Sequence, residues 1–330
     1  MIIEKSGGGE NQPVGRVVKF SLNETALCSN FLEILRPNKN IVYPAFAAYV
    51  CYSIWSNRKV IPSIKQTTGI QNLDISDYLN IKFKIPELNI QKKIANFLDH
   101  ETNHIDNLIS AKEYQISLLT EKRNTILKCT ILKGLCSPVK MKEAHLNWLK
   151  FVPNHWIVKS LKYVAKLQSG TNLKSEDLKE NEEYPVYGGN GFRGFYNEYN
   201  YDGHYLMIGR QGALCGNINY ANGKFWATEH AVVVTIFDNF NTIYLGELLK
   251  IMNLNQYSVS AAQPGLSVEV ISNLKIPCPP RKEQDEIVNY FEKEILKIDS
   301  LKESTVRSVI LLKERRSSLI TAAINGKTNI

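Results

Sequence analysis

The chain has 330 residues, of which 44% are hydrophobic, and a formal net charge of +8 at neutral pH. This length supplies core for two or three compact domains. No run of about 18 apolar residues predicts a membrane span, and the first residues lack the apolar stretch of a signal peptide, so we expect a cytoplasmic protein. The positive charge favours a polyanionic partner such as nucleic acid.

The cysteines are scattered and show no metal-binding spacing. No C-x-x-C pair occurs, and no His-x-x-x-His accompanies them; they are Cys28, Cys51, Cys129, Cys136, Cys215 and Cys278. We therefore expect buried free thiols rather than disulfides or a zinc site, and we expect neither a metal nor a cofactor.

About 80 residues precede the first long helical pattern, and they parallel a segment farther along the chain. Gly15-Arg-Val-Val18 corresponds to Gly216-Asn-Ile-Asn219, whereas nothing in this first segment corresponds to Trp148 through about Ile208. The N-terminal segment is therefore expected to form only half of a domain. Its Gly7–Gly9 run suits either a phosphate cradle or a turn between strands, and both interpretations stay open.

A repeat organises the rest of the chain. The stretch from Gln91 to Thr130 matches the stretch beginning at Gln284 at a constant offset of 193 residues, with 11 of 40 positions identical. A match of this length without gaps indicates two copies of one structural element. The identical pairs include Glu101/Glu294, Ile105/Ile298, Asp106/Asp299 and Arg123/Arg316.

Both copies are predicted to be long helices. Neither contains Pro or Gly, from Gln91 to Lys133 in one copy and from Arg281 to Asn325 in the other. Proline precedes each copy and glycine follows it, as expected at helix ends: Pro86 and Pro277–Pro280, then Gly134 and Gly326. Each helix would have about 40 residues and span roughly 60 Å. A helix of that length needs a packing partner along its course.

Between the helices, residues 148–276 are rich in Tyr, Gly and Asn and contain short β-prone runs. The runs are Leu161–Val164, His204–Ile208 and Ala231–Ile236, and turns are predicted at Gly188-Gly189, Asn190-Gly191 and Asn222-Gly223. This segment is expected to form a domain with a twisted, mostly antiparallel sheet.

The two helices carry matching apolar stripes at seven-residue spacings, which is typical of a coiled coil. The stripes consist of Ile94, Leu98, Ile105, Leu108, Leu119 and Ile126 in the first helix and Ile287, Phe291, Ile298, Leu301, Leu312 and Leu319 in the second. Both turn polar at the same offset, at Lys112 and Gln115 and at Thr305 and Ser308. Two unrelated bundle helices are the alternative, and the shared interruption disfavours them.

We expect the second helix to run antiparallel to the first, because the ends of the intervening domain can emerge close together. Pairing about the polar midpoint places Lys112 opposite Thr305. Glu101 then falls near Arg316 and Arg123 near Glu294, whereas a parallel pairing would join like charges. Such ion pairs would set orientation and register, and the apolar seam would supply the stability.

This organisation resembles the specificity subunit of type I restriction–modification systems, a family that alternates two target-recognition domains with two repeated helical regions. The resemblance covers essentially the whole chain, and the helical signature is its most specific part because it occurs twice. The stretches that carry it are Glu4–Arg16, Trp156–Val164, Ser169-Gly170, Tyr184–Gly191, Ile208–Gly212 and Ile276–Gln284.

The resemblance implies an α+β fold in which target-recognition domains with twisted, mostly antiparallel sheets alternate with two long helices packed as an antiparallel coiled coil. It implies the C-terminal half of a first recognition domain over residues 1–83 and a first helical region over 84–135. A second, complete recognition domain would span 136–276 and a second helical region 277–330. The N-terminal segment departs from the family pattern, which has a full first recognition domain.

The resemblance also implies a non-catalytic subunit that binds double-stranded DNA. Each recognition domain would read one half of a bipartite target. The helices would set the spacing and dock methyltransferase subunits and, through them, the restriction and translocase subunit.

Catalytic motifs are absent from the sequence. It has no Asn-Pro-Pro-aromatic methyltransferase motif, no phosphate-binding loop and no dinucleotide-binding glycine pattern. Asp177, Glu182 and Glu183 cluster, but a solvated loop explains them. We therefore expect no enzymatic activity from this chain alone.

Residues that read DNA need Arg or Lys for guanine edges and phosphates, and Asn or Gln for adenine edges. Such types lie beside glycines in the middle segment, where a close backbone approach is possible. The candidates there are Tyr187, Asn190, Arg193, Tyr196, Arg210, Gln211 and Lys224. The N-terminal segment offers the weaker candidates Lys5, Gln12, Arg16 and Lys19.

Two further functions compete with DNA recognition. An independent nuclease or methylase would turn over DNA with Mg²⁺ and S-adenosylmethionine alone. A truncated scaffold or recombination-cassette form would bind partner subunits but enrich no sequence from random DNA.

Overall fold

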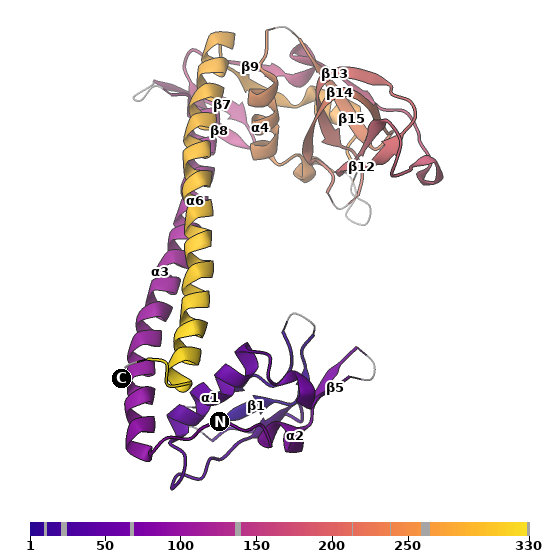
Figure 1. The fold of residues 1–330 in the computed structure, drawn as a ribbon. Coiled ribbons are helices and arrows are strands. Elements are labelled where there is room, and N and C mark those ends of the chain that lie inside the picture. Colours follow the sequence, from indigo (N-terminus) through magenta and orange to yellow (C-terminus); the bar gives the residue numbers. More distant parts are fainter. Residues whose placement is uncertain are drawn as a thin grey trace. The chain divides into compact units, whose positions relative to one another are not determined.

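The computed structural model describes residues 1–9, 12–20, 25–66, 69–135, 140–212, 214–237, 239–258 and 265–328. They form two compact units. Unit 1 consists of Met1–Leu118 and Leu301–Ile330, and unit 2 of Leu119–Ser300. Two long helices, α3 (Leu88–Lys133) and α6 (Arg281–Ile324), each contribute to both units (Figure 1).

The N-terminal part of unit 1 contains two small antiparallel sheets and two helices. One sheet has the order β3-β1-β4 and the other β2-β6-β5. The elements are β1 (Ile2–Glu4), β2 (Ser6–Gly7), β3 (Val17–Val18), β4 (Leu32–Ile34), α1 (Pro44–Ser56), η1 (Ile61–Ser63), β5 (Ile64–Gln66), β6 (Gln71–Leu73) and α2 (Ile75–Leu79). The core joins Ile3 of β1 and Phe46 of α1 to Leu98 of α3 and Ile320 of α6. The long helices therefore complete a core that the small sheets alone are too short to enclose.

Unit 2 is built on a six-stranded sheet of order β10-β15-β13-β14-β11-β12. All its pairings are antiparallel except β11 with β14, which confirms the expected mostly antiparallel sheet. Its strands are β10 (Ala165–Ser169), β11 (Tyr184–Gly188), β12 (Gly191–Tyr196), β13 (Tyr201–Gly209), β14 (Ile218–Ala227) and β15 (Ala231–Ile236).

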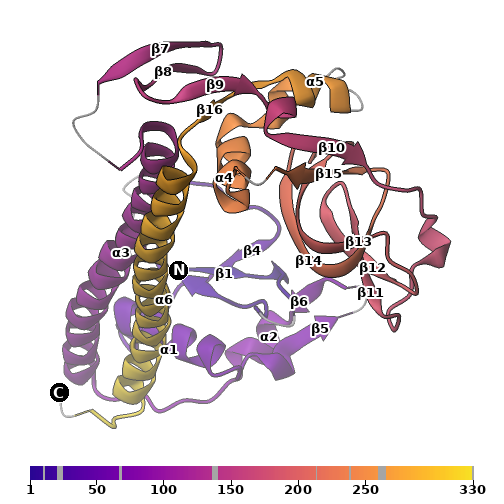
Figure 2. The same ribbon diagram turned by 90° about the horizontal axis from the view of Figure 1, so that it is seen from above.

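Most of the short elements of this unit lie on the side of the sheet that faces the long helices (Figure 2). Two small antiparallel pairs join β7 to β8 and β9 to β16. These elements and the remaining helices are β7 (Met141–Leu146), β8 (Leu149–Pro153), β9 (Ile157–Ser160), η2 (Leu161–Tyr163), η3 (Ser175–Asp177), α4 (Thr242–Met252), η4 (Leu254–Tyr257), α5 (Val268–Asn273) and β16 (Lys275–Cys278).

Two local predictions in this unit are wrong. Leu161–Val164 was expected to be a strand, but Leu161–Tyr163 forms the short helix η2 and the strand begins at Ala165. Leu161 is fully buried in the core, so its apolar character reflects packing rather than strand pairing. Asn222-Gly223 was expected to be a turn but lies within β14. Gly223 there has a φ of 74° and pairs with Gly203, so two glycines let the strands continue through an irregular point.

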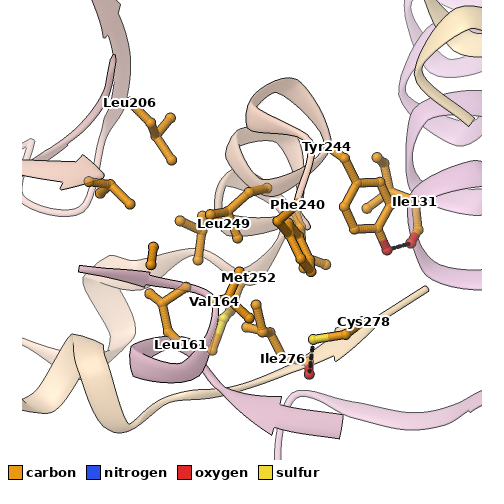
Figure 3. Packing of buried hydrophobic residues seen from close by; sticks show 14 of the residues in the cluster. Ile131, Leu161, Val164, Leu206, Phe240, Tyr244, Leu249, Met252, Ile276 and Cys278 are labelled. Atoms are coloured by element: carbon orange, nitrogen blue, oxygen red, sulfur yellow. Dashed lines mark hydrogen bonds between the residues drawn. The ribbon is translucent and has the colours of Figure 1, made fainter. Parts of the chain in front are cut away.

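The core of unit 2 joins the six-stranded sheet and α4 to the long helices. Figure 3 shows Tyr244 of α4 reaching α3, where its hydroxyl donates to the Ile131 carbonyl at 3.0 Å. Trp156 is fully buried in the same cluster, and its Nε1 donates to both carboxylate oxygens of Glu283 on α6, at 3.1 and 3.2 Å. The sheet and helices of this unit therefore share one continuous core.

The described cysteines are free, as expected, but Cys215 and Cys278 are the buried ones among them and Cys129 is exposed. Burial raises the pKa of Cys278 to about 11, which keeps its thiol protonated and unreactive at neutral pH. Cys136 lies outside the described residues.

The long helices confirm the predicted coiled coil. They have 46 and 44 residues, and within each unit their segments lie side by side and run in opposite directions (Figures 1 and 2). In unit 1 the seam buries Ile105, Ile109 and Val309. Leu108 and Leu301, which the stripes had assigned to the seam, are instead exposed. Ile109 takes the buried position beside Leu108.

The predicted interhelical ion pairs are wrong in register. Arg316 pairs with Asp106 at 2.8 Å rather than with Glu101, and Arg123 pairs with Asp299 at 3.1 Å rather than with Glu294. Each observed pair is the repeat equivalent of the other, because Asp106 matches Asp299 and Arg123 matches Arg316. The same Asp–Arg contact therefore forms once in each unit.

The register follows from the apolar seam. The predicted alignment assumed a polar midpoint at Lys112 and Thr305, yet Thr305 is only 3% exposed. Its hydroxyl donates to the Leu301 carbonyl at 2.8 Å, so the side chain packs in the seam without a polar break. Burial of Ile105, Ile109 and Val309 stabilises the pairing by more than exposed ion pairs can, and so it sets which carboxylates the arginines meet.

A buried glutamine holds each globular part to its long helix. Gln91, on α3, accepts a hydrogen bond from the backbone N–H of Tyr43 at 2.8 Å and donates to the Pro86 carbonyl at 2.8 Å. Gln284, its repeat equivalent on α6, accepts from the N–H of Asn241 at 2.8 Å and donates to the Pro279 carbonyl at 2.8 Å. Tyr43 and Asn241 are the N-cap residues of α1 and α4. We call these two contacts the glutamine latches.

Gln284→Ala is expected to destabilise unit 2 by about 1–3 kcal/mol, because it leaves a buried N–H and a buried carbonyl without partners. Gln91→Ala is the matched variant for unit 1. Hydrogen–deuterium exchange should show faster exchange in α4 for the first variant and in α1 for the second. Equal protection of both helices in both variants would contradict the latch role.

The two units share a strand arrangement that extends the repeat beyond the helices. In unit 1, β1 lies between β3 and β4, antiparallel to both. In unit 2, β13 lies between β14 and β15 in the same way, and a helix, α4, follows as α1 does in unit 1. The β1–β3 loop of unit 1 is therefore the counterpart of the β13–β14 loop of unit 2.

Candidate nucleic-acid interface

One end of the six-stranded sheet gathers several loops of unit 2. They are the β11–β12 turn, the start of the β13–β14 loop, the β14–β15 turn and the segment at Gly265. Backbone hydrogen bonds join them: the Arg210 N–H donates to His230 at 2.8 Å, and the Leu266 N–H donates to Arg210 at 2.9 Å. Gln211 also pairs with Gly265 in an isolated bridge. We call this set of loops the loop cluster.

Glycine is required where these loops pass each other. A Cβ added to Gly209 would collide with the Gly189 carbonyl, and one added to Gly170 would collide with the Ala227 carbonyl. Because the backbones touch, the loop cluster is held rigidly at its base, which preorganises the side chains it carries.

The loop cluster brings together four of the candidates chosen from sequence. Asn190, Arg193 and Gln211 line a pocket of about 560 Å³, and the backbone of Arg210 adjoins it. Asn217 Nδ2 donates to Asn190 Oδ1 at 3.2 Å and so orients that amide.

Both arginines of the loop cluster are oriented by serine hydroxyls. Arg193 Nη2 donates to Ser175 Oγ at 3.3 Å, and Arg210 Nη1 donates to Ser169 Oγ at 3.3 Å. Among the described residues neither guanidinium forms an ion pair, in contrast to Arg123. A guanidinium that a neutral hydroxyl positions keeps its charge and its remaining N–H groups available for a phosphate or a guanine edge.

The other three candidates of unit 2 lie elsewhere on the sheet, in an aromatic region. Tyr187 packs edge-on against Phe225, with ring centroids 5.6 Å apart. Tyr196 packs edge-on against Trp226 at 5.2 Å. Lys224 Nζ lies 4.7 Å from the ring centroid of Tyr199. These side chains are engaged in internal packing. Tyr187 nevertheless adjoins the loop cluster, because its carbonyl accepts from the Thr228 N–H at 2.9 Å and its ring packs edge-on against Phe192, which lines the pocket.

The N-terminal candidates do not converge. Lys5 pairs with Glu33 at 3.5 Å, and the Arg16 guanidinium lies over the Trp55 ring at 5.6 Å. Gln12 and Lys19 are exposed. Lys5, Gln12 and Arg16 nevertheless belong to the counterpart of the β13–β14 loop.

Sequence reasoning missed four residues in the loop cluster or in contact with it: Ser169, Ser175, Asn217 and His230. The serines act on arginines that are 41 and 18 residues away along the chain, and no local pattern indicates that distance. His230 lines the pocket from the β14–β15 turn. The one signal that the sequence offered for His230 was its place directly before the β-prone run Ala231–Ile236.

A second surface of unit 2 is a groove of about 1120 Å³ between α3, α4, α6 and the β13–β14 hairpin. Its apolar lining includes Leu127, Ile251 and Phe291, and Leu296 stands beside them with 70% of its side chain exposed. We call it the helix groove.

Within the described ranges, no cluster of three or more His, Cys, Asp and Glu side chains is arranged to hold a metal ion. A search of the same ranges finds no helix with the length and apolar character of a membrane span.

Unit 2 presents arginine and amide side chains on rigid, glycine-rich loops next to paired long helices. These features are typical of the class of DNA-recognition subunits. The chain belongs to the type I restriction–modification specificity family: the model of the type I restriction modification DNA specificity domain matches residues 9–117 and 153–307.

Known relatives agree with this membership. The EcoprrI specificity subunit of Escherichia coli is 42% identical over 139 residues, which are 41% of this chain and 35% of that relative's own length. The HsdS subunit of Thermoanaerobacter tengcongensis superposes with a TM-score of 0.57 at 17% identity, over 91% of this chain and 75% of that one. A chain from a structure of a type I R-M system superposes with a TM-score of 0.73 at 17% identity, over 91% and 76%. These two structural similarities show the fold of the chain.

Proposed function

We propose that this chain is a non-catalytic specificity subunit whose unit 2 reads one half of a bipartite double-stranded DNA target through the loop cluster. The observation that carries the proposal is the convergence of Arg193, Arg210, Asn190 and Gln211 at one end of the sheet. These side chains supply donors for guanine edges and phosphates and bidentate amides for adenine edges. Residues 136–276 would form the complete recognition domain, and residues 1–83 would form the counterpart of its second half.

The test is a selection from random-sequence duplex DNA with the purified full chain, at a stated salt concentration. We expect the bound pool to be enriched in one short motif, with weak overall affinity because one module buries little surface. A pool with no enriched motif would favour the scaffold function. Turnover of DNA by the chain with Mg²⁺ and S-adenosylmethionine would favour an independent enzyme.

We propose further that the helix groove docks a methyltransferase subunit, which would link the chain to a restriction and translocase subunit. Exposed apolar side chains on the long helices of each unit support this proposal, since they lack cover from the described residues. In unit 2 they are Tyr290 and Leu296, and in unit 1 they are Ile90, Leu108, Tyr114, Leu118, Leu301, Val306, Ile310 and Leu311.

Leu296→Glu is expected to weaken binding of the cognate methyltransferase subunit about 10- to 100-fold, because it removes one buried leucine contact and places a charge in the groove. Leu27→Glu is the matched control, since Leu27 is fully exposed in unit 1. Titration by calorimetry measures both. Equal affinity of the wild type and Leu296→Glu would exclude the helix groove as the docking site.

A further inference from the structure

The turn between β14 and β15 consists of Thr228, Glu229 and His230 and forms one wall of the loop-cluster pocket. Its backbone is tied on both sides. The His230 carbonyl accepts from the Arg210 N–H at 2.8 Å, and the Ala231 N–H donates to Thr228 at 3.0 Å. The Gly189 backbone passes so close that an added Cβ would lie 3.1 Å from the His230 carbonyl oxygen. The imidazole, which is about 40% exposed, therefore extends from a fixed backbone and lines the pocket.

This turn also carries polar atoms that the described residues leave unsatisfied. Thr228 Oγ1 and Glu229 Oε2 are buried and have no hydrogen-bond partner there. Unsatisfied buried polar atoms cost free energy and are rare in folded proteins, so two in one short turn mark a place with a function beyond packing.

The carboxylate of Glu229 lies beside the imidazole of His230. Its Oε1 lies 3.1 Å from His230 Nε2, and its second oxygen has no donor of its own. In the neutral imidazole, a negative charge at that distance favours the tautomer with the proton on Nε2, which leaves Nδ1 as a hydrogen-bond acceptor. The other charged group of the pocket lining, Arg193, donates only. His230 thus adds a side-chain acceptor of fixed position to a pocket otherwise dominated by donors and amides.

We propose that His230 is a specificity-determining residue that accepts, through Nδ1, a hydrogen bond from the exocyclic amino group of a base in the major groove. Adenine N6 and cytosine N4 are the amino groups displayed there, whereas guanine and thymine display acceptors at the corresponding edge. His230 therefore selects adenine or cytosine on one strand at one position of the half-site. Glu229 acts as the positioning residue. The inference rests on the proposed reading of DNA by the loop cluster.

The test is the same selection from random duplex DNA, performed with the full chain and its variants at pH 8. In His230→Ala the preference for adenine or cytosine at one position should fall about three- to tenfold, the value of one hydrogen bond, while the remainder of the motif persists. His230→Arg should shift that position to guanine, because it replaces an acceptor by donors. Glu229→Ala should weaken the preference without reversing it.

His104→Ala is the matched control, since His104 is exposed on α3 in unit 1. It should leave both motif and affinity unchanged. An unchanged motif in His230→Ala and His230→Arg would overturn the inference. So would a loss of affinity that is equal for all sequences, because a phosphate contact behaves in that way. A wild-type chain that enriches no motif would instead refute the proposed function itself.

Discussion

Arg210→Ala and Arg193→Ala are each expected to weaken binding to the selected DNA motif by about 1–3 kcal/mol, or about 5- to 150-fold. The reason is that each guanidinium is positioned by a serine hydroxyl, at 3.3 Å in both cases, and forms no ion pair among the described residues. The alanine substitution would remove the positive charge and the free N–H groups of the guanidinium together. Binding isotherms by fluorescence anisotropy, on the enriched motif and on scrambled DNA, measure the effect.

Salt dependence distinguishes what each arginine contacts. If the arginine reads a guanine edge, its alanine variant should lose more affinity for the motif than for scrambled DNA. The slope of log affinity against log salt concentration should stay nearly unchanged. If the arginine contacts a phosphate, its alanine variant should lose affinity for both DNAs, and the magnitude of this slope should fall by about one. Arg315→Ala is the control for net charge, since Arg315 is exposed on α6. If both loop-cluster variants bind like this control, the assigned interface is wrong.

Trp156→Ala is expected to have the largest effect on stability, about 3–5 kcal/mol for unit 2. Trp156 is fully buried, packs in the cluster that contains Ile131, and donates to both oxygens of Glu283. Its loss creates a cavity and removes a donor from a partly buried carboxylate. Urea unfolding followed by circular dichroism measures the cost without depending on tryptophan fluorescence.

Trp156→Phe separates the two contributions. It keeps much of the apolar burial but removes the indole N–H, so that His155, at 2.8 Å, is the remaining side-chain contact of Glu283 among those described here. We expect an intermediate cost of about 1–3 kcal/mol. A Trp156→Ala chain that unfolds at the wild-type urea concentration would show that this contact does not hold unit 2 together.

The internal repeat explains why these effects should stay local. Each unit has its own glutamine latch, at Gln91 or Gln284, and its own Asp–Arg pair between the helices. Gln91 and Gln284 are each 1% exposed, so the latches lie inside the cores that they serve. A variant at one latch is therefore expected to perturb the globular part of one unit and to leave the other long-helix contact intact.

Several features of this protein were predictable from the sequence because local chemistry determines them. The repeat and the absence of Pro and Gly predicted both long helices, and α3 and α6 extend over Leu88–Lys133 and Arg281–Ile324. The β-branched run Ala231–Ile236 forms β15 with those limits. Backbone propensity and the spacing of apolar residues act over a few turns or strand residues, so a single sequence carries this information.

The tertiary structure alone decided the contacts between distant residues. The ion pairs formed with Asp106 and Asp299 rather than Glu101 and Glu294, because burial along the whole seam determines the register and an exposed ion pair contributes too little to shift it. Residue type suggested seven DNA-binding candidates in the middle segment, yet in the folded chain they have different packing partners. Tyr187, Tyr196 and Lys224 pack against aromatic neighbours, while Arg193 contacts a serine of the short helix η3 and Arg210 contacts a serine of β10. Which polar side chains remain free for a ligand depends on which internal partners the fold supplies, and those partners lie far apart in the sequence.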